Sequence, residues 1–282
     1  MTKNIIFVAD VFADQILGGG ELNNDELIKI LRDKKHQVTE KKSYEITLSF
    51  LKKRTSFGYI ISNFILLPTE IKYFIQENCN YIIYEHDHKY LSTRDPSMFE
   101  NYKAPSSYII NHEFYKKAKA VICQSKLHAE VVRKNILTNN IISVGGNLWS
   151  LGTLDFLAEL FKKEKKDKYS IWQSENPIKN TEKAVMFCKY KKYEFELVGG
   201  LPYRDFLARI TDNQSFVFFP ETLETLCRVA VECRMAGMSV ITSDKIGAAS
   251  EDWFSLKGTH LIEKMKEKRE EIPSIVLSEL SL

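Results

Sequence analysis

Short apolar runs alternate along the chain with segments in which apolar residues recur at helical spacing. Runs such as 5–9 and 216–220 end in polar or turn-forming residues, which is typical of strands buried on both faces. Leu27, Ile30 and Leu31 recur at the spacing of one helix face. The pattern predicts strands at 5–9, 34–40, 59–62, 81–84, 120–124, 141–144, 169–174, 195–199, 216–220 and 239–244. It predicts helices at 26–33, 125–135, 155–168, 180–189 and 203–210, and one more after Glu224.

This repeated succession of strand and helix is the pattern of parallel α/β sheets with helices on both faces. The series restarts near residue 169 after a charged connector, so we expect two doubly wound, Rossmann-like domains facing a cleft. We place one domain at 1–158 and the other at 159–282, with a C-terminal helical tail that begins near Lys257. Ligands of such sheets bind beyond the carboxyl ends of the strands, where the candidate residues below lie.

Composition places the chain among globular proteins. The 282 residues are 44% hydrophobic and 27% charged, and no apolar run approaches the roughly eighteen residues that span a bilayer. Residues 1–10 enter a strand directly, without the layout of a signal peptide. Five scattered cysteines without a CxxC pair are typical of reduced thiols. We therefore expect a cytoplasmic protein without stable membrane insertion; its oligomeric state stays open.

The charge is mildly basic but unevenly spread. A net charge of +3 and a pI near 8.4 do not by themselves indicate a polyanionic partner. Lysines gather at 162–168 and 189–193. Such runs are most often solvated faces or linkers, although they could also neutralise the phosphates of a nucleic acid.

The segment from Phe216 to Gly237 carries the most specific chemistry. A predicted strand ends in Pro220, and Glu224 follows in a loop that leads into a helix bearing Glu232. A loop that feeds a helix N-terminus presents unpaired N–H groups and a positive dipole end, which suits a diphosphate. Carboxylates beside it can accept hydrogen bonds from sugar and ribose hydroxyls. The segment predicts a nucleotide-sugar pocket; the alternative is an amphipathic helix with two solvated glutamates.

The same segment resembles the retaining GT-B glycosyltransferases of the large family numbered four. Their signature is two glutamates separated by seven residues, which Glu224 and Glu232 match, and the following Ala236-Gly237 and strand 239–244 match as well. The resemblance implies a GT-B fold, a UDP-linked sugar as co-substrate, no bound metal and no other cofactor. It implies that Glu224 contacts the donor sugar and Glu232 the ribose.

One departure lies directly after the first glutamate. The family commonly has Gly-Phe-Gly there, whereas this chain has Thr225, Leu226 and Cys227. Side chains at these positions narrow the space beside the diphosphate. We therefore expect Thr225 and Leu226 to border the donor, and the donor sugar to be unusual.

Three further positions could hold the donor's diphosphate. Gly19 and Gly20 fall where the family places a glycine-rich phosphate loop, although a structural tight turn would have the same sequence. Lys179 matches the family's phosphate-binding lysine. The family's arginine has no counterpart, because Ser174 stands at its position. A diphosphate needs cationic compensation, so we expect Arg228 to supply it; the alternative is a solvated arginine.

A polar segment, 85–94, follows the predicted strand at 81–84 and suggests a second site. His86 and His88 with nearby carboxylates could bind a divalent metal, but no third ligand follows at a suitable spacing. The pattern also resembles the strand-end motif of phage DNA α-glucosyltransferases. That resemblance covers about ten residues and implies that Asp87 faces the acceptor, with His86, His88 and Arg94 beside it. The alternative is that the histidines only cap the strand and hold loops together.

The sequence thus predicts transfer of a sugar to an acceptor hydroxyl, with Asp87, His86 and Glu224 as the catalytic group. Residues 1–158 would then form the acceptor-binding domain and residues 159–282 the nucleotide-sugar-binding domain. The short motif and the lysine clusters favour a hydroxymethylated base in DNA as the acceptor. A cell-surface glycan or lipid-linked saccharide is the second reading. A non-catalytic nucleotide-binding module is the third, because the arginine and the Gly-Phe-Gly are missing.

Overall fold

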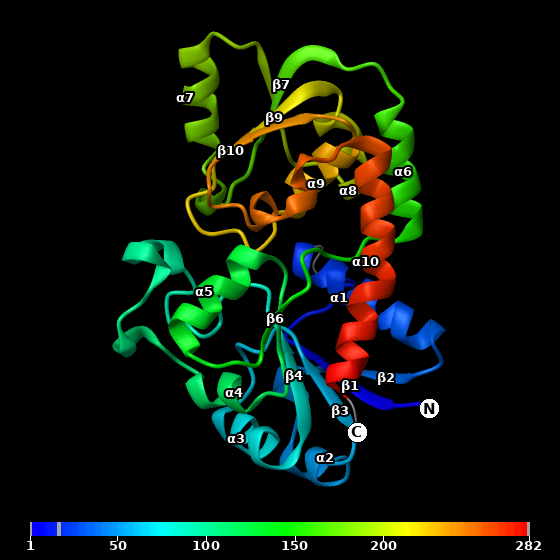
Figure 1. Cartoon of the computed structure of the whole chain (residues 1–282), viewed down its shortest axis with the longest axis vertical. Helices are drawn as coiled ribbons and strands as arrows, with labels where there is room; N and C mark the ends of the chain where they lie inside the picture. Colours follow the sequence, from blue (N-terminus) through cyan, green and yellow to red (C-terminus); the bar gives the residue numbers. More distant parts are fainter. Residues whose placement is uncertain (1, 16–17, 281–282) are drawn as a thin grey trace. The chain divides into compact units, whose positions relative to one another are not determined.

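The computed structural model describes residues 2–15 and 18–280, which divide into two compact units (Figure 1). Unit 1 comprises the chain up to Trp149 together with the residues from Lys268 onward, and unit 2 comprises Ser150–Glu267. Each unit is built around its own parallel sheet.

The sheet of unit 1 has six strands in the order β2-β1-β3-β4-β5-β6. All its pairings are parallel. Its strands are β1 (Asn4–Ala9), β2 (Gln37–Lys42), β3 (Gly58–Ile61), β4 (Asn80–Tyr84), β5 (Val121–Cys123) and β6 (Ile141–Ser143). Its helices are α1 (Gly19–Asp33), α2 (Leu48–Lys52), α3 (Thr69–Asn78), α4 (His112–Lys117) and α5 (Lys126–Ile136). The strand order reverses direction between β1 and β3, which is where ligands of open α/β sheets bind.

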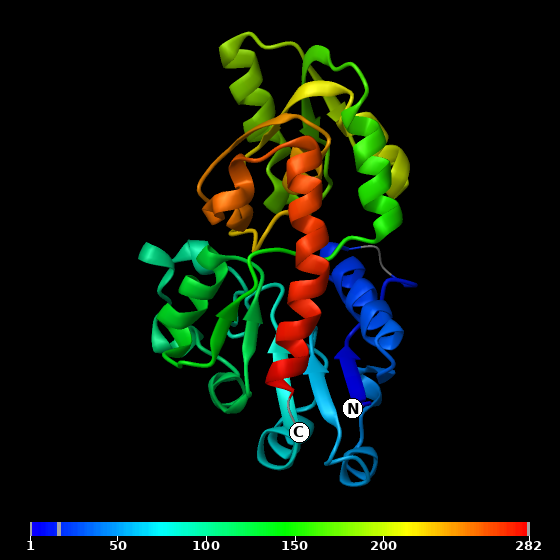
Figure 2. The ribbon, with the colours of Figure 1, turned by 45° about the vertical axis from the view of Figure 1, so that its right-hand side comes forward.

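Both faces of this sheet are covered, as the unbroken apolar runs predict. Along β1, Ile6 and Val8 enter the core on one face, whereas Ile5 and Phe7 enter the core on the other. The second core also takes in the last turns of α10 (Gly258–Glu279), whose end runs alongside this sheet (Figure 2). The C-terminal tail predicted from Lys257 onward is therefore a single helix, and its last residues belong to unit 1.

Unit 2 has a four-stranded parallel sheet in the order β10-β9-β7-β8, which reverses direction between β7 and β9. Its strands are β7 (Lys166–Trp172), β8 (Phe195–Val198), β9 (Asn213–Phe218) and β10 (Ser239–Thr242). Its helices are α6 (Leu151–Phe161), α7 (Thr181–Lys191), α8 (Tyr203–Ile210) and α9 (Arg228–Met235), together with the first part of α10.

Two glycines let the backbone pass closely over α6. Gly237, at the end of α9, has a φ of 92°, and Gly258, at the start of α10, has a φ of 54°. A Cβ atom at either position would lie 2.8 or 2.5 Å from the ring of Phe161. Glycine is therefore required at both positions by conformation and by space, and the glycine of the Ala-Gly match has this structural role.

The structure corrects two predicted elements. The helix expected at 155–168 spans Leu151–Phe161, and β7 begins at Lys166, because Lys166 pairs with Asn213 of β9. This backbone pairing overrides the charged, helix-like pattern of the segment. The boundary between the units falls at Trp149 and Ser150, whereas the predicted boundary at 158/159 lies inside α6.

The glycine-rich segment also differs from the predicted turn. Gly19 and Gly20 are the first residues of α1, and this helix begins seven residues before the predicted start at Glu26. The Glu21 side chain folds back over Gly18, where an added Cβ would lie 2.2 Å from its Oε2. A glutamate in the first turn that reaches back in this way helps to close a helix N-terminus.

Candidate functional site

The predicted donor residues of unit 2 gather where β7 and β9 end. Lys179 lies between β7 and α7, and Glu224 lies between β9 and α9. Because β7 and β9 flank the reversal in strand order, these two loops border the crevice that ligands of such sheets occupy. Glu224 lies in a loop and Glu232 lies within α9, as predicted.

Lys179 and Glu224 form an ion pair at this edge of the sheet. Lys179 Nζ donates to Glu224 Oε1 at 2.6 Å, and both side chains are less than one-fifth exposed. The same ammonium lies 5.1 Å from the ring centroid of Trp172, the last residue of β7. Burial would lower the pKa of Lys179, but the Glu224 carboxylate overcomes this effect and raises it. Lys179 is therefore a fixed cation held beside a carboxylate.

The backbone fixes the loop that carries Glu224. Glu224 N donates to Lys245 O at 2.9 Å, and Gly247 N donates to Glu224 O at 2.8 Å, which forms an isolated parallel bridge with Ile246. Ala248 N donates to Leu226 O at 3.0 Å. The segment after β10 thus holds this loop in place, so the Glu224 carboxylate is presented from a rigid backbone.

Glu232 is a buried member of a second polar group. Tyr203 Oη, from the first residue of α8, donates to Glu232 Oε1 at 2.6 Å, and Arg228 Nε lies 3.5 Å from the same oxygen. The side chains of Arg228 and Glu232 are 8% and 1% exposed, so Arg228 is not a solvated arginine. Burial and the Glu232 carboxylate raise the pKa of Tyr203, which keeps its hydroxyl as a proton donor. Tyr203 also lines a pocket of about 280 Å³ beside α6.

The two polar groups meet around Cys227, the residue that caps α9. Its φ of 73° is a left-handed conformation, and its thiol is buried. Burial, then the Glu224 carboxylate, raises the pKa of this thiol; Glu232 adds to the rise, and Lys179 opposes it. Of the two predicted neighbours of the donor, Leu226 is buried and Thr225 is half-buried.

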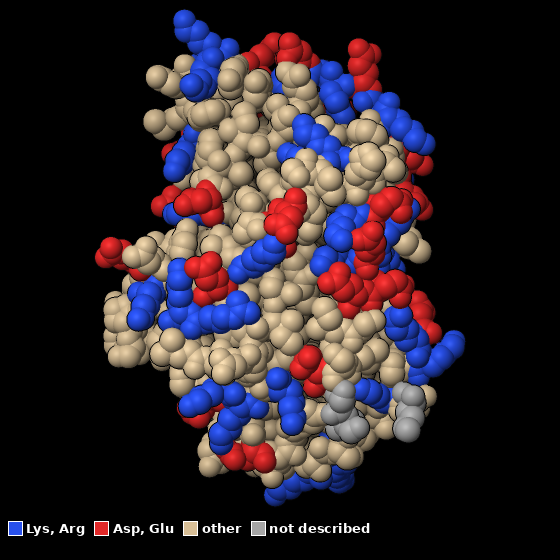
Figure 3. All heavy atoms as spheres, in the orientation of Figure 1, with Lys and Arg blue, Asp and Glu red and all other residues tan. Residues whose placement is uncertain are grey.

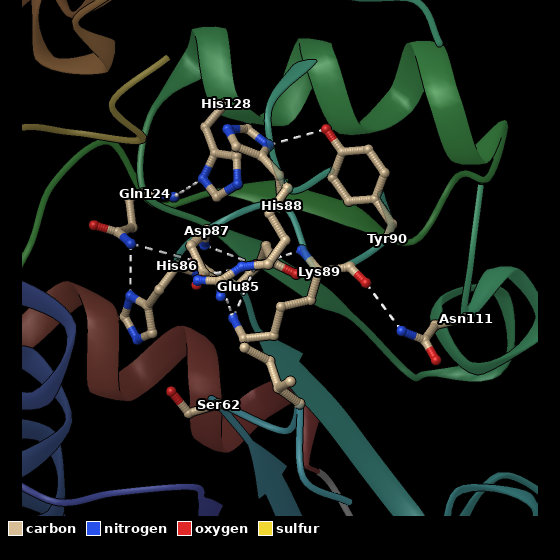
Figure 4. Close-up of polar contacts among 12 residues, drawn as sticks. Ser62, Glu85, His86, Asp87, His88, Lys89, Tyr90, Asn111, Gln124 and His128 are labelled. Atoms are coloured by element: carbon tan, nitrogen blue, oxygen red, sulfur yellow. Dashed lines mark hydrogen bonds and ion pairs between the residues drawn. The ribbon is translucent and has the colours of Figure 1, made fainter. Parts of the chain in front are cut away.

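In unit 1, the start of α1 meets the segment after β4. A Cβ atom at Gly20 would lie 3.4 Å from Cγ of His86, so the imidazole packs directly against the glycine backbone. Both ring nitrogens of His86 have partners. Nε2 lies 2.8 Å from Asn24 Oδ1. Nδ1 lies 2.6 Å from Gln124 Nε2 (Figure 4). The amide partners assign a proton to Nε2 and an acceptor role to Nδ1. His86 is therefore held in one tautomer and one orientation.

A buried carboxylate, Glu85, organises the turn that follows β4. Glu85 Oε1 accepts from the backbone N–H groups of His86 and Asp87 at 3.0 and 2.9 Å, and from Lys89 Nζ at 3.2 Å. Its other oxygen accepts from the hydroxyl of Tyr115. The backbone of the turn thus wraps around one carboxylate, which determines where the next side chains point.

Asp87 is the exposed end of this network. Its carboxylate pairs with Lys89 and with Arg94, and its side chain is 32% exposed. Burial alone would raise the pKa of Asp87, but Lys89 and Arg94 overcome this effect and hold it at about 2. Asp87 is therefore an anion at neutral pH. His88, by contrast, is buried, and its ring packs at 4.9 Å against His128 while Nδ1 lies 3.0 Å from Tyr90 Oη.

The structure also bears on metal binding, on membrane spans and on the lysine cluster at 162–168. Within residues 2–15 and 18–280, no group of three or more His, Cys, Asp or Glu side chains could hold a metal ion, and no helix is long and apolar enough to cross a membrane. In the 162–168 cluster, Lys165 Nζ donates to two backbone carbonyls, and Lys166 and Lys168 pair with carboxylates. The face shown in Figure 3 mixes basic and acidic side chains.

The structure brings predicted residues together in pairs: Lys179 with Glu224, Arg228 with Glu232, Asp87 with Arg94, and Gly20 with His86. The first two pairs lie in unit 2 and the last two in unit 1. Sequence reasoning missed Tyr203, Trp172 and the organising role of Glu85. Trp172 could have been noticed as an aromatic residue at a strand end. Tyr203 lies 29 residues from its partner, and no sequence pattern joins the two.

Comparison with known proteins supports the fold. No protein-family model matches the sequence, and no curated protein is significantly similar to it in sequence. The Alr3699/HepE protein of Anabaena, in complex with UDP and glucose, matches with a TM-score of 0.56 at 12% identity, over 99% of this chain and 95% of that chain. Sucrose-phosphate synthase of Thermosynechococcus elongatus matches with a TM-score of 0.60 at 10% identity, over 99% and 98%. The E. coli protein bound with UDP-2-fluoro glucose matches with a TM-score of 0.56 at 8% identity, over 98% and 96%.

At such low sequence identities, the similarity to these structures is evidence for the fold alone. Two parallel sheets with alternating helices, matched along nearly the whole chain, show that the protein has the GT-B fold of glycosyltransferases, and the predicted fold class is confirmed. An α-glucosyltransferase in complex with UDP and a 13-mer DNA matches less closely, with a TM-score of 0.49 at 10% identity, which is too distant to bear on the acceptor.

Proposed function

We propose that the protein transfers a sugar from a UDP-linked donor to an acceptor hydroxyl. The observation that carries this proposal is the arrangement of Lys179–Glu224 and Arg228–Glu232 around the start of α9, at the carboxyl edge of the unit 2 sheet. Cations suit the diphosphate, and carboxylates suit sugar hydroxyls. Further support comes from the shared fold of proteins solved with UDP, UDP-glucose or UDP-2-fluoro glucose.

In this proposal the protein acts by positioning its substrates and stabilising the departing diphosphate. Lys179, Arg228 and the backbone at Thr225 hold the leaving group. Glu232 accepts from the ribose hydroxyls, and Glu224 accepts from those of the donor sugar. Configuration at the anomeric carbon is retained, with no metal ion and no covalent glutamate intermediate.

A bound donor has to replace or share the contacts that Glu224 and Glu232 make within the protein. In the structure, Glu224 accepts from Lys179, and Glu232 accepts from Tyr203 Oη. A ribose hydroxyl has the same donor chemistry as the tyrosine hydroxyl, so it can replace Tyr203 at Glu232 Oε1 or use the second carboxylate oxygen. When Glu224 turns to the sugar hydroxyls, the diphosphate replaces it as the anion that pairs with Lys179.

For the acceptor we propose that Asp87 receives the hydroxyl, with His86 holding the surrounding turn. A hydroxymethylated base in DNA is supported by the strand-end motif and by the exposed lysines of 189–193. The 162–168 cluster adds less support, because three of its lysines have partners within the protein. A glycan or lipid-linked saccharide uses the same hydroxyl chemistry. Such an acceptor stays the alternative.

Incubation of the protein with a panel of UDP-sugars tests the proposal. The acceptors are hydroxymethylated duplex DNA, unmodified duplex DNA and a saccharide, and mass spectrometry detects the added sugar. We expect UDP release and a mass increase in one hydroxyl acceptor. Sugar on the saccharide alone would exclude the DNA acceptor. Absence of UDP binding by calorimetry would exclude the transferase, whereas UDP binding with neither hydrolysis nor transfer would indicate a nucleotide-binding module.

A further inference from the structure

Unit 1 contains a small pocket beside Asp87. It has a volume of about 190 Å³, and its walls come from the loop after β3, helix α3, the segment after β4 and the residues before α4. This volume is below the roughly 300 Å³ at which pockets for whole drug-sized ligands begin. The pocket therefore suits a compact chemical group that belongs to a larger molecule.

Three cations line this pocket: Lys72, Lys89 and Arg94. Lys89 pairs with Glu85 and Asp87, and Arg94 pairs with Asp87. The carboxylates of Glu85 and Asp87 thus pair with two of the three cations. Lys72 has no such ion pair within the described residues.

Lys72 differs from the other two cations in its hydrogen-bond partner. Its Nζ donates to Asn111 Oδ1, a neutral oxygen, at 2.9 Å, and no ion pair joins it to a carboxylate in the part of the chain that the structure describes. The side chain of Lys72 is half-buried, and burial lowers its pKa; the Asp10 carboxylate only partly offsets this effect. A half-buried ammonium that lacks a direct ion pair is less stable than a paired one, so an anion in the pocket would stabilise it.

Hydrogen bonds of the Asn111 and Asp10 side chains hold the walls of this pocket in place. Asn111 accepts from Lys72 and donates to Lys89 O at 2.9 Å, which ties helix α3 to the turn after β4 (Figure 4). Asp10 accepts from the backbone N–H groups of Ile65 and Leu66, which fixes the loop that forms another wall. The cations are therefore arranged before a ligand binds.

Arg94 occupies a costly conformation at the mouth of this pocket. Its φ of 55° lies in the left-handed region, which is unfavourable for an arginine. Within the described residues its guanidinium donates through Nη2 alone, to Asp87. A guanidinium presents five donors in a planar fork that matches a phosphate. Its remaining edge is therefore suited to an anion with several oxygen atoms.

We propose that this pocket binds a phosphate group carried by the acceptor. This inference rests on the proposed function, because it assigns the bound molecule to the acceptor that meets Asp87. The buried side chains of Phe64 and Leu91 form the inner part of the walls, and their low polarity strengthens the contact of Lys72 with the anion. The phosphate anchors the acceptor, and the neighbouring Asp87 receives its hydroxyl.

Calorimetry with inorganic phosphate tests the pocket, with the protein first saturated with UDP so that the donor's own phosphate site is filled. The variants are Lys72→Met and Arg94→Gln, and the matched control is Lys183→Met, which removes one exposed lysine of α7 in unit 2. We expect each pocket variant to weaken phosphate binding at least tenfold and the control to bind as the parent does. Circular dichroism confirms that each variant is folded.

Two further titrations identify the source of the phosphate. A hexose 6-phosphate represents a monoester acceptor, and a short DNA duplex represents a phosphodiester; Lys72-dependent binding of either supports the proposal. If UDP binds but phosphate, monoester and duplex all bind equally well to the parent and Lys72→Met, or not at all, the pocket inference is wrong and the donor site stands. If UDP itself does not bind, the proposed function fails.

Discussion

Replacement of Lys179 by Met probes the donor site most sharply. The ammonium lies 2.6 Å from Glu224 and 5.1 Å from the centroid of the Trp172 ring, with 18% of the lysine side chain exposed. Methionine keeps much of the apolar stem and removes the charge. Loss of a partly buried ion pair should cost more stability than loss of an exposed pair and less than loss of a fully buried pair. We therefore expect a loss of about 1–2 kcal/mol.

The loss of nucleotide affinity should be larger than the loss of stability. A hydrogen bond to a charged group contributes about 1.5–3 kcal/mol, so Lys179→Met should weaken UDP binding by about 10- to 150-fold. Turnover should fall further, because negative charge on the departing diphosphate grows in the transition state. Calorimetry gives the Kd for UDP, and UDP release from the active UDP-sugar gives the turnover.

Glu224→Gln completes a double-mutant cycle with this variant. Because Lys179 and Glu224 touch, their effects on UDP binding should be non-additive by about 0.5–3 kcal/mol. Lys183→Met removes a nearby exposed lysine of α7, serves as the charge control and should change nothing. If Lys179→Met is folded and binds UDP within twofold of the parent, Lys179 does not contact the diphosphate.

Three further predictions concern the other paired residues. Glu232→Ala should lose about 2–3 kcal/mol of UDP affinity, because ribose hydroxyls lose a charged acceptor; unchanged calorimetry in a folded variant would remove Glu232 from the site. Arg228→Ala should cost more free energy in transition-state stabilisation, measured by turnover, than in stability of the fold, measured by the melting temperature. A parent-like rate would mean that another group replaces the missing family arginine. Asp87→Asn should abolish transfer while UDP still binds. Because the pKa of Asp87 is held below its ordinary 3.8, at about 2, its ion pairs stabilise the fold above pH 4 and are lost as the pH falls to 2. The parent should therefore lose about 1–2 kcal/mol more than Asp87→Asn across that interval, after a discount for partial exposure; equal acid denaturation curves would contradict this.

The fold could be predicted because its strands are parallel and buried on both faces. Such strands read as short apolar runs, and the polar residues after them mark the edge of the sheet where ligands bind. Glu224 and Glu232 therefore stood out, and the structure places one in the loop and the other within α9, as expected. Local patterns of this kind can be recognised in the sequence without knowledge of tertiary contacts.

The remaining features depend on contacts between distant segments. Charged residues 166–168 look helical, but pairing with β9 makes them part of a strand. Tyr203 meets Glu232 only because α8 and α9 belong to the same unit and their side chains converge. The pocket around Lys72 is assembled from four separate segments. None of these arrangements leaves a periodic signal in the sequence.

The central claim is that the chain uses a UDP-linked sugar as its donor. Its most direct test is calorimetric titration of UDP and a panel of UDP-sugars into the parent protein, Lys179→Met and Glu232→Ala, with Lys183→Met as the control. The account predicts saturable binding to the parent and the control, weakened at least tenfold in both site variants. Equal affinity in all four proteins, or no binding to the parent, would contradict it.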